Sequence, residues 1–155
     1  ESTYKLLTQK KGGRDLPIFA QKRQTSRSGI VRGMHQSSNG ILLGTNAFWE
    51  GVDLPGNLLE ILIIVKMPFD VPTEPIVKAY GDLVEAQGGN RFMDYALPES
   101  VIRFRQGFGR LIRTTYDEGV FIVMDDRIVN KRYGTAFSDV IPVDLKRFSN
   151  INDLS

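Results

Sequence analysis

The sequence contains no cysteine and a single histidine, His35. A chain without thiols forms no disulfide, holds no thiolate cluster and offers no cysteine nucleophile. One histidine cannot build a histidine metal site alone, and nothing in the sequence supports a Ser-His-Asp triad, so we interpret His35 as an ordinary residue at a helix end and predict no metal site. We find no signal peptide and no apolar run long enough to span a bilayer, which predicts a cytoplasmic protein without a membrane partner.

Charge is distributed unevenly along the 155 residues. Residues 1–35 carry eight Lys or Arg and two Asp or Glu, whereas residues 36–155 carry twelve basic and sixteen acidic side chains. A basic N-terminal third is compatible with nucleic-acid binding and equally with a plain soluble surface, and both readings stay open. The chain starts at Glu1 without a methionine, inside a predicted helix, so we expect a fragment of a longer protein.

Apolar runs alternate with amphipathic stretches along the chain. The runs predict strands at 16–20, 41–43, 60–66 and 120–124. The amphipathic stretches predict helices at 2–10, 26–36, from a Thr73 cap to Gly88-Gly89, at 98–114 and at 134–140, with a connector at 90–97. Strands that are apolar throughout are typical of a parallel sheet covered by helices on both faces, so the fold class is α/β.

The most informative stretch is 98–114, PESVIRFRQGFGRLIRT. In a helix, Arg103, Gln106, Arg110 and Arg113 would share an arc of roughly 80°, and Val101, Phe104, Phe108, Leu111 and Ile112 would face the opposite side. A row of arginines without an acidic neighbour indicates a surface that faces an anion, since the guanidinium group pairs well with phosphate. A solvated basic face is the alternative.

A second informative stretch, 44–56, follows a predicted strand and reads GTNAFWEGVDLPG. We expect Phe48 and Trp49 to pack into the core. Thr45 and Asp53 would lie at the carboxyl end of a strand, where ligands bind in parallel sheets, and could hold phosphate, ribose or a metal-bound water. The acidic pair Asp125-Asp126 is flanked by Arg127, which favours a loop cap or ion pair over a metal site.

Together these two stretches resemble motifs V and VI of superfamily-2 DNA helicases. The segments FWEGVD, QGFGRLIR, MPFDVPTEP and DDRIVNKRYG are similar to those of the DinG branch of these helicases, which is related to XPD. The resemblance covers most of residues 16–142. It implies that residues 1–155 are the second, C-terminal RecA-like motor domain of a helicase, with a three-layer fold of a parallel sheet between helices.

The resemblance also implies roles for the matched residues. In motif VI, Gln106, Arg110 and Arg113 would face ATP, with Arg113 as the arginine finger and Arg110 as its partner at the phosphates. The residues implied to bind ATP through motif V are Glu50, Gly51 and Asp53. The residues implied to meet the DNA strand are Gln21, Ser26, Arg27 and Thr45.

The departures from a complete helicase are equally clear. The sequence contains no GxxxxGK[ST] phosphate loop and no DEAH-like motif, so ATP and Mg²⁺ would be bound mainly by a first motor domain that is absent here. The implied activity is ATP-dependent, 5′→3′ unwinding from single-stranded DNA, in DNA repair, with the N-terminal motor domain as partner. The alternative is a non-catalytic RecA-like module for nucleic-acid binding or interaction.

Purified residues 1–155 alone are therefore predicted not to hydrolyse ATP. The arginine side of an ATP site cannot replace the phosphate loop and the metal ligands. A phosphate-release assay with magnesium and single-stranded DNA checks this expectation. Magnesium-dependent turnover by the purified 155 residues would contradict it.

Overall fold

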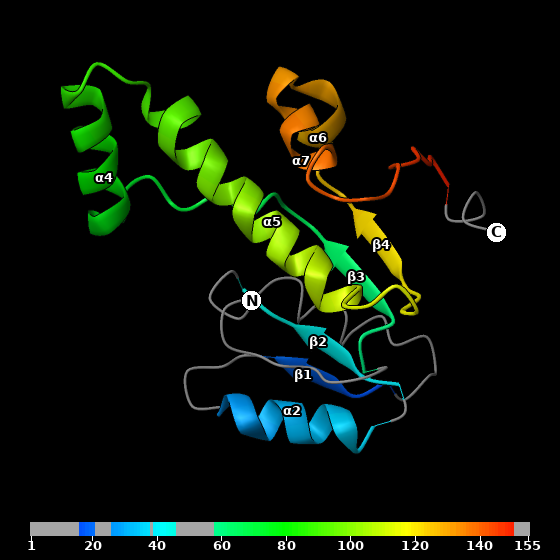
Figure 1. The fold of residues 1–155 in the computed structure, drawn as a ribbon. Coiled ribbons are helices and arrows are strands. Elements are labelled where there is room, and N and C mark those ends of the chain that lie inside the picture. Colours follow the sequence, from blue (N-terminus) through cyan, green and yellow to red (C-terminus); the bar gives the residue numbers. More distant parts are fainter. Residues whose placement is uncertain (1–15, 21–25, 38, 46–57, 151–155) are drawn as a thin grey trace. The chain divides into compact units, whose positions relative to one another are not determined.

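The computed structural model describes residues 16–20, 26–37, 39–45 and 58–150 (Figure 1). The chain divides into two compact units, the first made of Glu1–Ile61 and Arg110–Val120, the second of Leu62–Gly109 and Phe121–Ser155. We describe each unit separately. The predicted helix at 2–10 lies outside the described residues. Helices and short parallel strands are mixed in the part that is described, in keeping with an α/β fold.

The first unit contains a strand–helix–strand arrangement. Strand β1, Ile18–Ala20, is followed by helix α2, Arg27–His35, and by strand β2, Ile41–Leu43. The two strands pair in parallel, with Ile18 opposite Ile41. Parallel neighbours need a crossover connection, and α2 lies in that connection. Both strands and the helix confirm the predictions made from the sequence.

Helix α2 begins where a serine caps it and is buried on one side. The Ser26 hydroxyl accepts a hydrogen bond of 3.1 Å from the backbone N–H of Gly29, which satisfies one of the unpaired donors at the helix start. Ile30 and Met34 are buried. His35 is the last residue of the helix, which confirms its interpretation as a helix-end residue.

The second unit holds most of the remaining elements, although its boundaries fall inside β3, α5 and β4. In chain order they are strand β3 (Ile61–Ile64), helix α4 (Pro75–Ala86), π-helix η2 (Arg91–Ala96), helix α5 (Leu97–Leu111), strand β4 (Val120–Val123), helix α6 (Arg127–Asn130), 3₁₀ helix η3 (Arg132–Gly134) and helix α7 (Thr135–Ser138). Helix α7 confirms the predicted last helix, whereas α6 and η3 were not predicted.

Strands β3 and β4 form a second small sheet. The N–H of Val120 donates to the carbonyl of Glu60 at 2.9 Å, and the N–H of Met124 donates to that of Ile64 at 2.8 Å. Both partners advance by four residues in the same direction, so the strands run parallel. Within the described ranges the four strands form two pairs rather than the single sheet that the sequence predicts.

The prediction that β3 is buried on both faces is wrong. Ile64 is buried, but Ile61 and Ile63 are 55% and 49% exposed. Successive side chains of a strand point to opposite faces, so this alternation means that one face of β3 is covered and the other is open. An apolar run shows which side chains could be buried, but it does not show which element covers them.

Aromatic rings form the core of the second unit. Phe104 and Phe137 are completely buried. The ring of Phe104 meets those of Phe121 and Phe137 edge-on, with centroid distances of 5.4 and 5.3 Å, and Phe108 meets Phe121 at 5.3 Å. Edge-on pairs contribute roughly 0.5–1.5 kcal/mol each beyond the burial of their surface. These contacts fix α5 against β4 and α7 and confirm the predicted apolar face of the helix.

Helix α4 departs from the predicted pattern in two ways. Its N-cap is Glu74, directly before Pro75, and not Thr73. The predicted amphipathic helix has an apolar stripe that includes Ile76, Tyr80 and Leu83, and these three residues are exposed. The spacing predicted the helix correctly, but the stripe is not buried within this chain.

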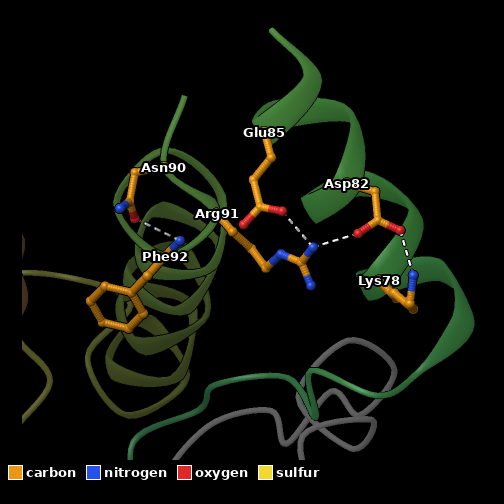
Figure 2. A network of polar contacts seen from close by, with 6 residues as sticks. All are labelled: Lys78, Asp82, Glu85, Asn90, Arg91 and Phe92. Atoms are coloured by element: carbon orange, nitrogen blue, oxygen red, sulfur yellow. Dashed lines mark hydrogen bonds and ion pairs between the residues drawn. The ribbon is translucent and has the colours of Figure 1, made fainter. Parts of the chain in front are cut away.

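The segment predicted as a connector at 90–97 is largely helical. Asn90 caps η2 by accepting hydrogen bonds from the N–H groups of Phe92 and Met93, at 3.0 and 2.9 Å. Figure 2 shows that Arg91 extends from η2 toward α4, where its guanidinium group pairs with Asp82 and, at 2.8 Å, with Glu85. A cap and an ion-pair network therefore order a segment whose sequence lacks a clear helical period.

An aspartate at the end of β4 fixes the chain that follows β3. The Asp125 carboxylate accepts the N–H of Met67 at 2.8 Å and pairs with the Arg127 guanidinium at 2.5 Å. The Arg127 guanidinium also lies over the Phe69 ring, 5.4 Å from its centroid. The side-chain hydrogen bond from Arg127 is the main reason that the pKa of Asp125 falls to about 2. This confirms the prediction of an ion pair at Asp125-Asp126.

Replacing Asp125 by Asn is expected to lower the free energy of unfolding at pH 7 by about 2 kcal/mol, the equivalent of the pKa shift. The pKa is depressed on folding, so the stabilisation is full above the ordinary aspartate value of 3.8 and is lost as the pH falls through about 2. Urea titrations of wild type and Asp125→Asn at pH 7, 4 and 2.5 check this. Asp126→Asn, at the exposed neighbour, is the control, and equal stability of wild type and Asp125→Asn at pH 7 would contradict the prediction.

Candidate functional site

Helix α5 carries the side chains that the sequence singles out. It runs from Leu97 to Leu111, with Pro98 in its first turn, where its missing N–H costs no hydrogen bond. Arg103, Gln106 and Arg110 follow one another at steps of three and four residues, which places them on one side of an α-helix. Burial of Phe104, Phe108 and Leu111 fixes which side that is.

Arg103 forms ion pairs with carboxylates of its own unit. Its guanidinium group lies 2.7 Å from the carboxylate of Asp70 and 3.8 Å from that of Glu99. The side chains of Arg103 and Asp70 are only 17% and 22% exposed, so this ion pair is partly shielded from water. The sequence places no acid between Arg103 and Arg113, but the fold supplies one from the loop after β3. Arg103 is therefore removed from the predicted anion-facing row on α5.

Gln106 and Arg110 lie one helical turn apart on α5. Gln106 is exposed and Arg110 is half-buried. An amide and a guanidinium group in this relation present several N–H donors, the chemistry that binds phosphate oxygens.

Arg113 lies beyond the end of α5, contrary to the prediction of a helix through Thr114. Its side chain is exposed. Its backbone N–H donates to Oδ2 of Asp117 at 2.7 Å, and the N–H of Thr114 donates to the same oxygen at 2.8 Å. These two bonds lower the pKa of Asp117, that from Arg113 having the larger effect. The side chain of Arg113 therefore extends from a hydrogen-bonded turn and not from the face of a helix.

The reasoning from sequence did not single out Asp117. The available signal was an Asp four residues after Arg113 in the polar segment TTYDEG. Aspartate side chains often accept hydrogen bonds from backbone N–H groups nearby in the chain and so compete with helix formation.

The residues predicted to meet DNA are described in part. Ser26 and Arg27 lie at the start of α2, and the Ser26 hydroxyl caps that helix. Thr45 is exposed, two residues after β2. Gln21 lies outside the described residues, as do the predicted ATP-binding residues Glu50, Gly51 and Asp53. The side-chain contacts of the motif V loop thus stay predictions.

No cluster of three or more His, Asp or Glu side chains in the described ranges could hold a metal ion. Among the same residues, no helix has the length and apolar character that crossing a membrane requires.

The chain is similar to known proteins. The family model for the helicase C-terminal domain matches residues 1–144. The chain is 49% identical over 102 residues to the ATP-dependent DNA helicase DinG of Photobacterium profundum, a match that covers 66% of this chain and 15% of the relative. It is 39% identical over 127 residues to the ATP-dependent DNA helicase YoaA of Escherichia coli, covering 82% of this chain and 20% of the relative.

A third relative carries a different name. The chain is 44% identical over 113 residues to the 3'-5' exonuclease DinG of Bacillus subtilis, covering 73% of this chain and 12% of the relative. The chain thus spans a fifth or less of the length of each of these three relatives.

The glycine next to Arg110 offers a direct test of the helix surface. A Cβ at Gly109 would meet nothing within 4 Å in the described part of the chain, whereas one at Gly81 in α4 would lie 2.8 Å from the side chain of Arg91. Gly109→Ala is therefore expected to stabilise the protein by up to about 1 kcal/mol through helix propensity. Gly81→Ala, the matched control, is expected to be less stable than Gly109→Ala by about 1 kcal/mol, because Arg91 must move.

Thermal unfolding of the two variants beside wild type measures both effects. A loss of stability in Gly109→Ala would mean that the helix surface beside Arg110 is already filled, and would contradict the structure at this point.

Proposed function

Because the chain belongs to the helicase C-terminal domain family, we propose that it is the second motor domain of a DinG-like, ATP-dependent DNA helicase. In this proposal it supplies the arginine side of an ATP site, and a first motor domain supplies the phosphate loop and the Mg²⁺ ligands. The observation that carries the proposal is the pair Gln106 and Arg110 on α5, followed by exposed Arg113 in a hydrogen-bonded turn. DNA-helicase relatives that match over most of this chain support it.

The fold that goes with this function is RecA-like, with three layers. Parallel strand pairs with helices in their connections support it. A complete parallel sheet would gather the two strand pairs and place the loops after their carboxyl ends on one edge, where such sheets bind ligands.

Each motif VI side chain then has a distinct task. Arg113 donates to the oxygens of the transferring phosphoryl group and stabilises the charge that spreads over them in the transition state. Arg110, half-buried and thus less free to move, holds a neighbouring phosphate. Gln106 donates its amide N–H groups to a phosphate oxygen or to the attacking water. Arg103 takes no part, because Asp70 and Glu99 neutralise it.

The DNA strand would run along the first unit. Ser26 and Arg27 lie at the N-terminus of α2, and Thr45 lies just after β2. A helix N-terminus carries partial positive charge and backbone N–H groups, which favours contact with phosphate. Binding of this kind depends on the DNA backbone, so it tolerates many sequences and weakens with salt. Unwinding in the 5′→3′ direction, a role in DNA repair and a cytoplasmic location are part of the same proposal.

Replacing Arg113 by Ala in the intact protein is expected to lower kcat for DNA-stimulated ATP hydrolysis by on the order of 10²–10³-fold. Binding of single-stranded DNA should change little, since Arg113 would act on ATP. The matched control is Arg105→Ala, which removes an exposed arginine from the same helix and is expected to stay near wild type.

The measurements are initial rates of phosphate release and DNA affinity for wild type and both variants. Full activity of Arg113→Ala would contradict the finger assignment. An intact wild-type protein that binds DNA without stimulated hydrolysis would favour the non-catalytic module instead.

A further inference from the structure

We propose that Asp117 is the positioning residue for Arg113 and that its carboxylate holds the backbone from which the finger reaches ATP. This inference rests on the proposed function. One carboxylate oxygen of Asp117 accepts the N–H groups of two consecutive residues, Arg113 and Thr114, at 2.7 and 2.8 Å. One of these two hydrogen bonds is thus donated by Arg113, the residue whose side chain is proposed to be the arginine finger.

The turn is closed from both directions. While the Asp117 side chain accepts from Arg113 and Thr114, the backbone N–H of Asp117 donates to the carbonyl of Thr114 at 3.3 Å. The N–H of Tyr116 donates to the Thr114 hydroxyl at 3.3 Å. Four hydrogen bonds therefore fix a segment of only five residues, 113–117.

Neither special residue types nor apolar packing explains the turn at this segment. Residues 112–118, IRTTYDE, contain neither glycine nor proline, the residue types that favour special turn geometries. Thr114 and Thr115 are exposed, and Tyr116 is 93% exposed, so apolar packing does not order the middle of the turn. The hydrogen bonds of Asp117 are thus a direct restraint on the backbone of Arg113 and Thr114.

The charge of Asp117 makes the restraint stronger. Hydrogen bonds from the backbone N–H groups of Arg113 and Thr114 lower the pKa of Asp117 from its ordinary value, which favours the ionised carboxylate. Bonds to an ionised acceptor are shorter and stronger than bonds between neutral groups. An anion beyond the C-terminus of a helix gains nothing from the helix dipole, which leaves the hydrogen bonds as the stabilising contribution.

The size of the effect follows from how steeply catalysis depends on position. A misplacement of about 1 Å at a reacting group can reduce a rate by about 100-fold. Loss of the Asp117 carboxylate would not remove the Arg113 guanidinium but would let it sample other positions. We therefore expect kcat to fall by about 10-fold, less than on removing Arg113 itself.

The experiment uses the intact protein and measures kcat and KM for DNA-stimulated ATP hydrolysis. The variants are Asp117→Ala, Asp117→Asn, Arg113→Ala and the double variant, with Glu118→Ala as a control that removes the adjacent, exposed acid. Asp117→Ala is expected to lower kcat about 10-fold. Asp117→Asn, whose amide oxygen still accepts both N–H groups, is expected to retain most of the activity, and Glu118→Ala all of it.

The double variant separates positioning from general stability. If Asp117 acts through Arg113, Asp117→Ala costs nothing further once Arg113 is Ala, so the double variant equals Arg113→Ala within about twofold. An equal loss from Asp117→Ala in both backgrounds would overturn the inference, and so would an unchanged or raised kcat in Asp117→Ala. Should Asp117→Ala fail to fold, Asp117→Glu, which moves the carboxylate outward by one methylene, replaces it in the same comparison.

Failure of the proposed function gives a different result. If the proposed function is wrong, Arg113→Ala retains the full kcat of wild type, whatever the kcat of the Asp117 variants. An impaired Arg113→Ala beside an unimpaired Asp117→Ala leaves the proposed function standing and removes only the positioning role.

Discussion

The burial of Phe104 and Phe108 in the aromatic core of the second unit is the constraint on which the candidate site depends. Burial of a phenylalanine side chain contributes roughly 1.5–3 kcal/mol, more than an exposed ion pair can offset. The two rings, which pack edge-on against Phe121, set the rotation of α5 about its own axis. Once the rotation is set, Gln106 and Arg110 must lie on the other side of the helix. The burial of the two rings therefore determines where the N–H donors of Gln106 and Arg110 lie.

The same region shows what sequence reasoning can predict. The 3.6-residue period predicted α5 and its buried face, and the apolar runs predicted all four described strands, because both signals depend on neighbours along the chain. The end of α5 was missed because it is decided by a competing interaction. Asp117 takes the N–H groups of Arg113 and Thr114, and no glycine or proline marks the place.

Contacts between residues that are far apart in the chain could not be predicted from the sequence, because they depend on the fold. Arg103 and Asp70 are separated by more than thirty positions, and no local sequence pattern predicts that they form an ion pair. The Ser26 hydroxyl caps α2, so any contact of this hydroxyl with DNA would have to share it with the cap. The resemblance to helicase motifs named the remaining candidates, among which Gln21, Glu50, Gly51 and Asp53 lie outside the described residues.

The way in which η2 is attached to α4 has a consequence of its own. Arg91, itself 35% exposed, joins the two elements through ion pairs with Asp82 and Glu85, whose side chains are about half exposed, whereas α5 is held by buried rings. Counter-ions weaken the former and leave the latter almost untouched. Salt therefore acts on this domain selectively: it weakens the ionic part of the attachment of α4, leaving the stacked rings of Tyr80 and Tyr95, while the helix that carries Arg110 stays in place.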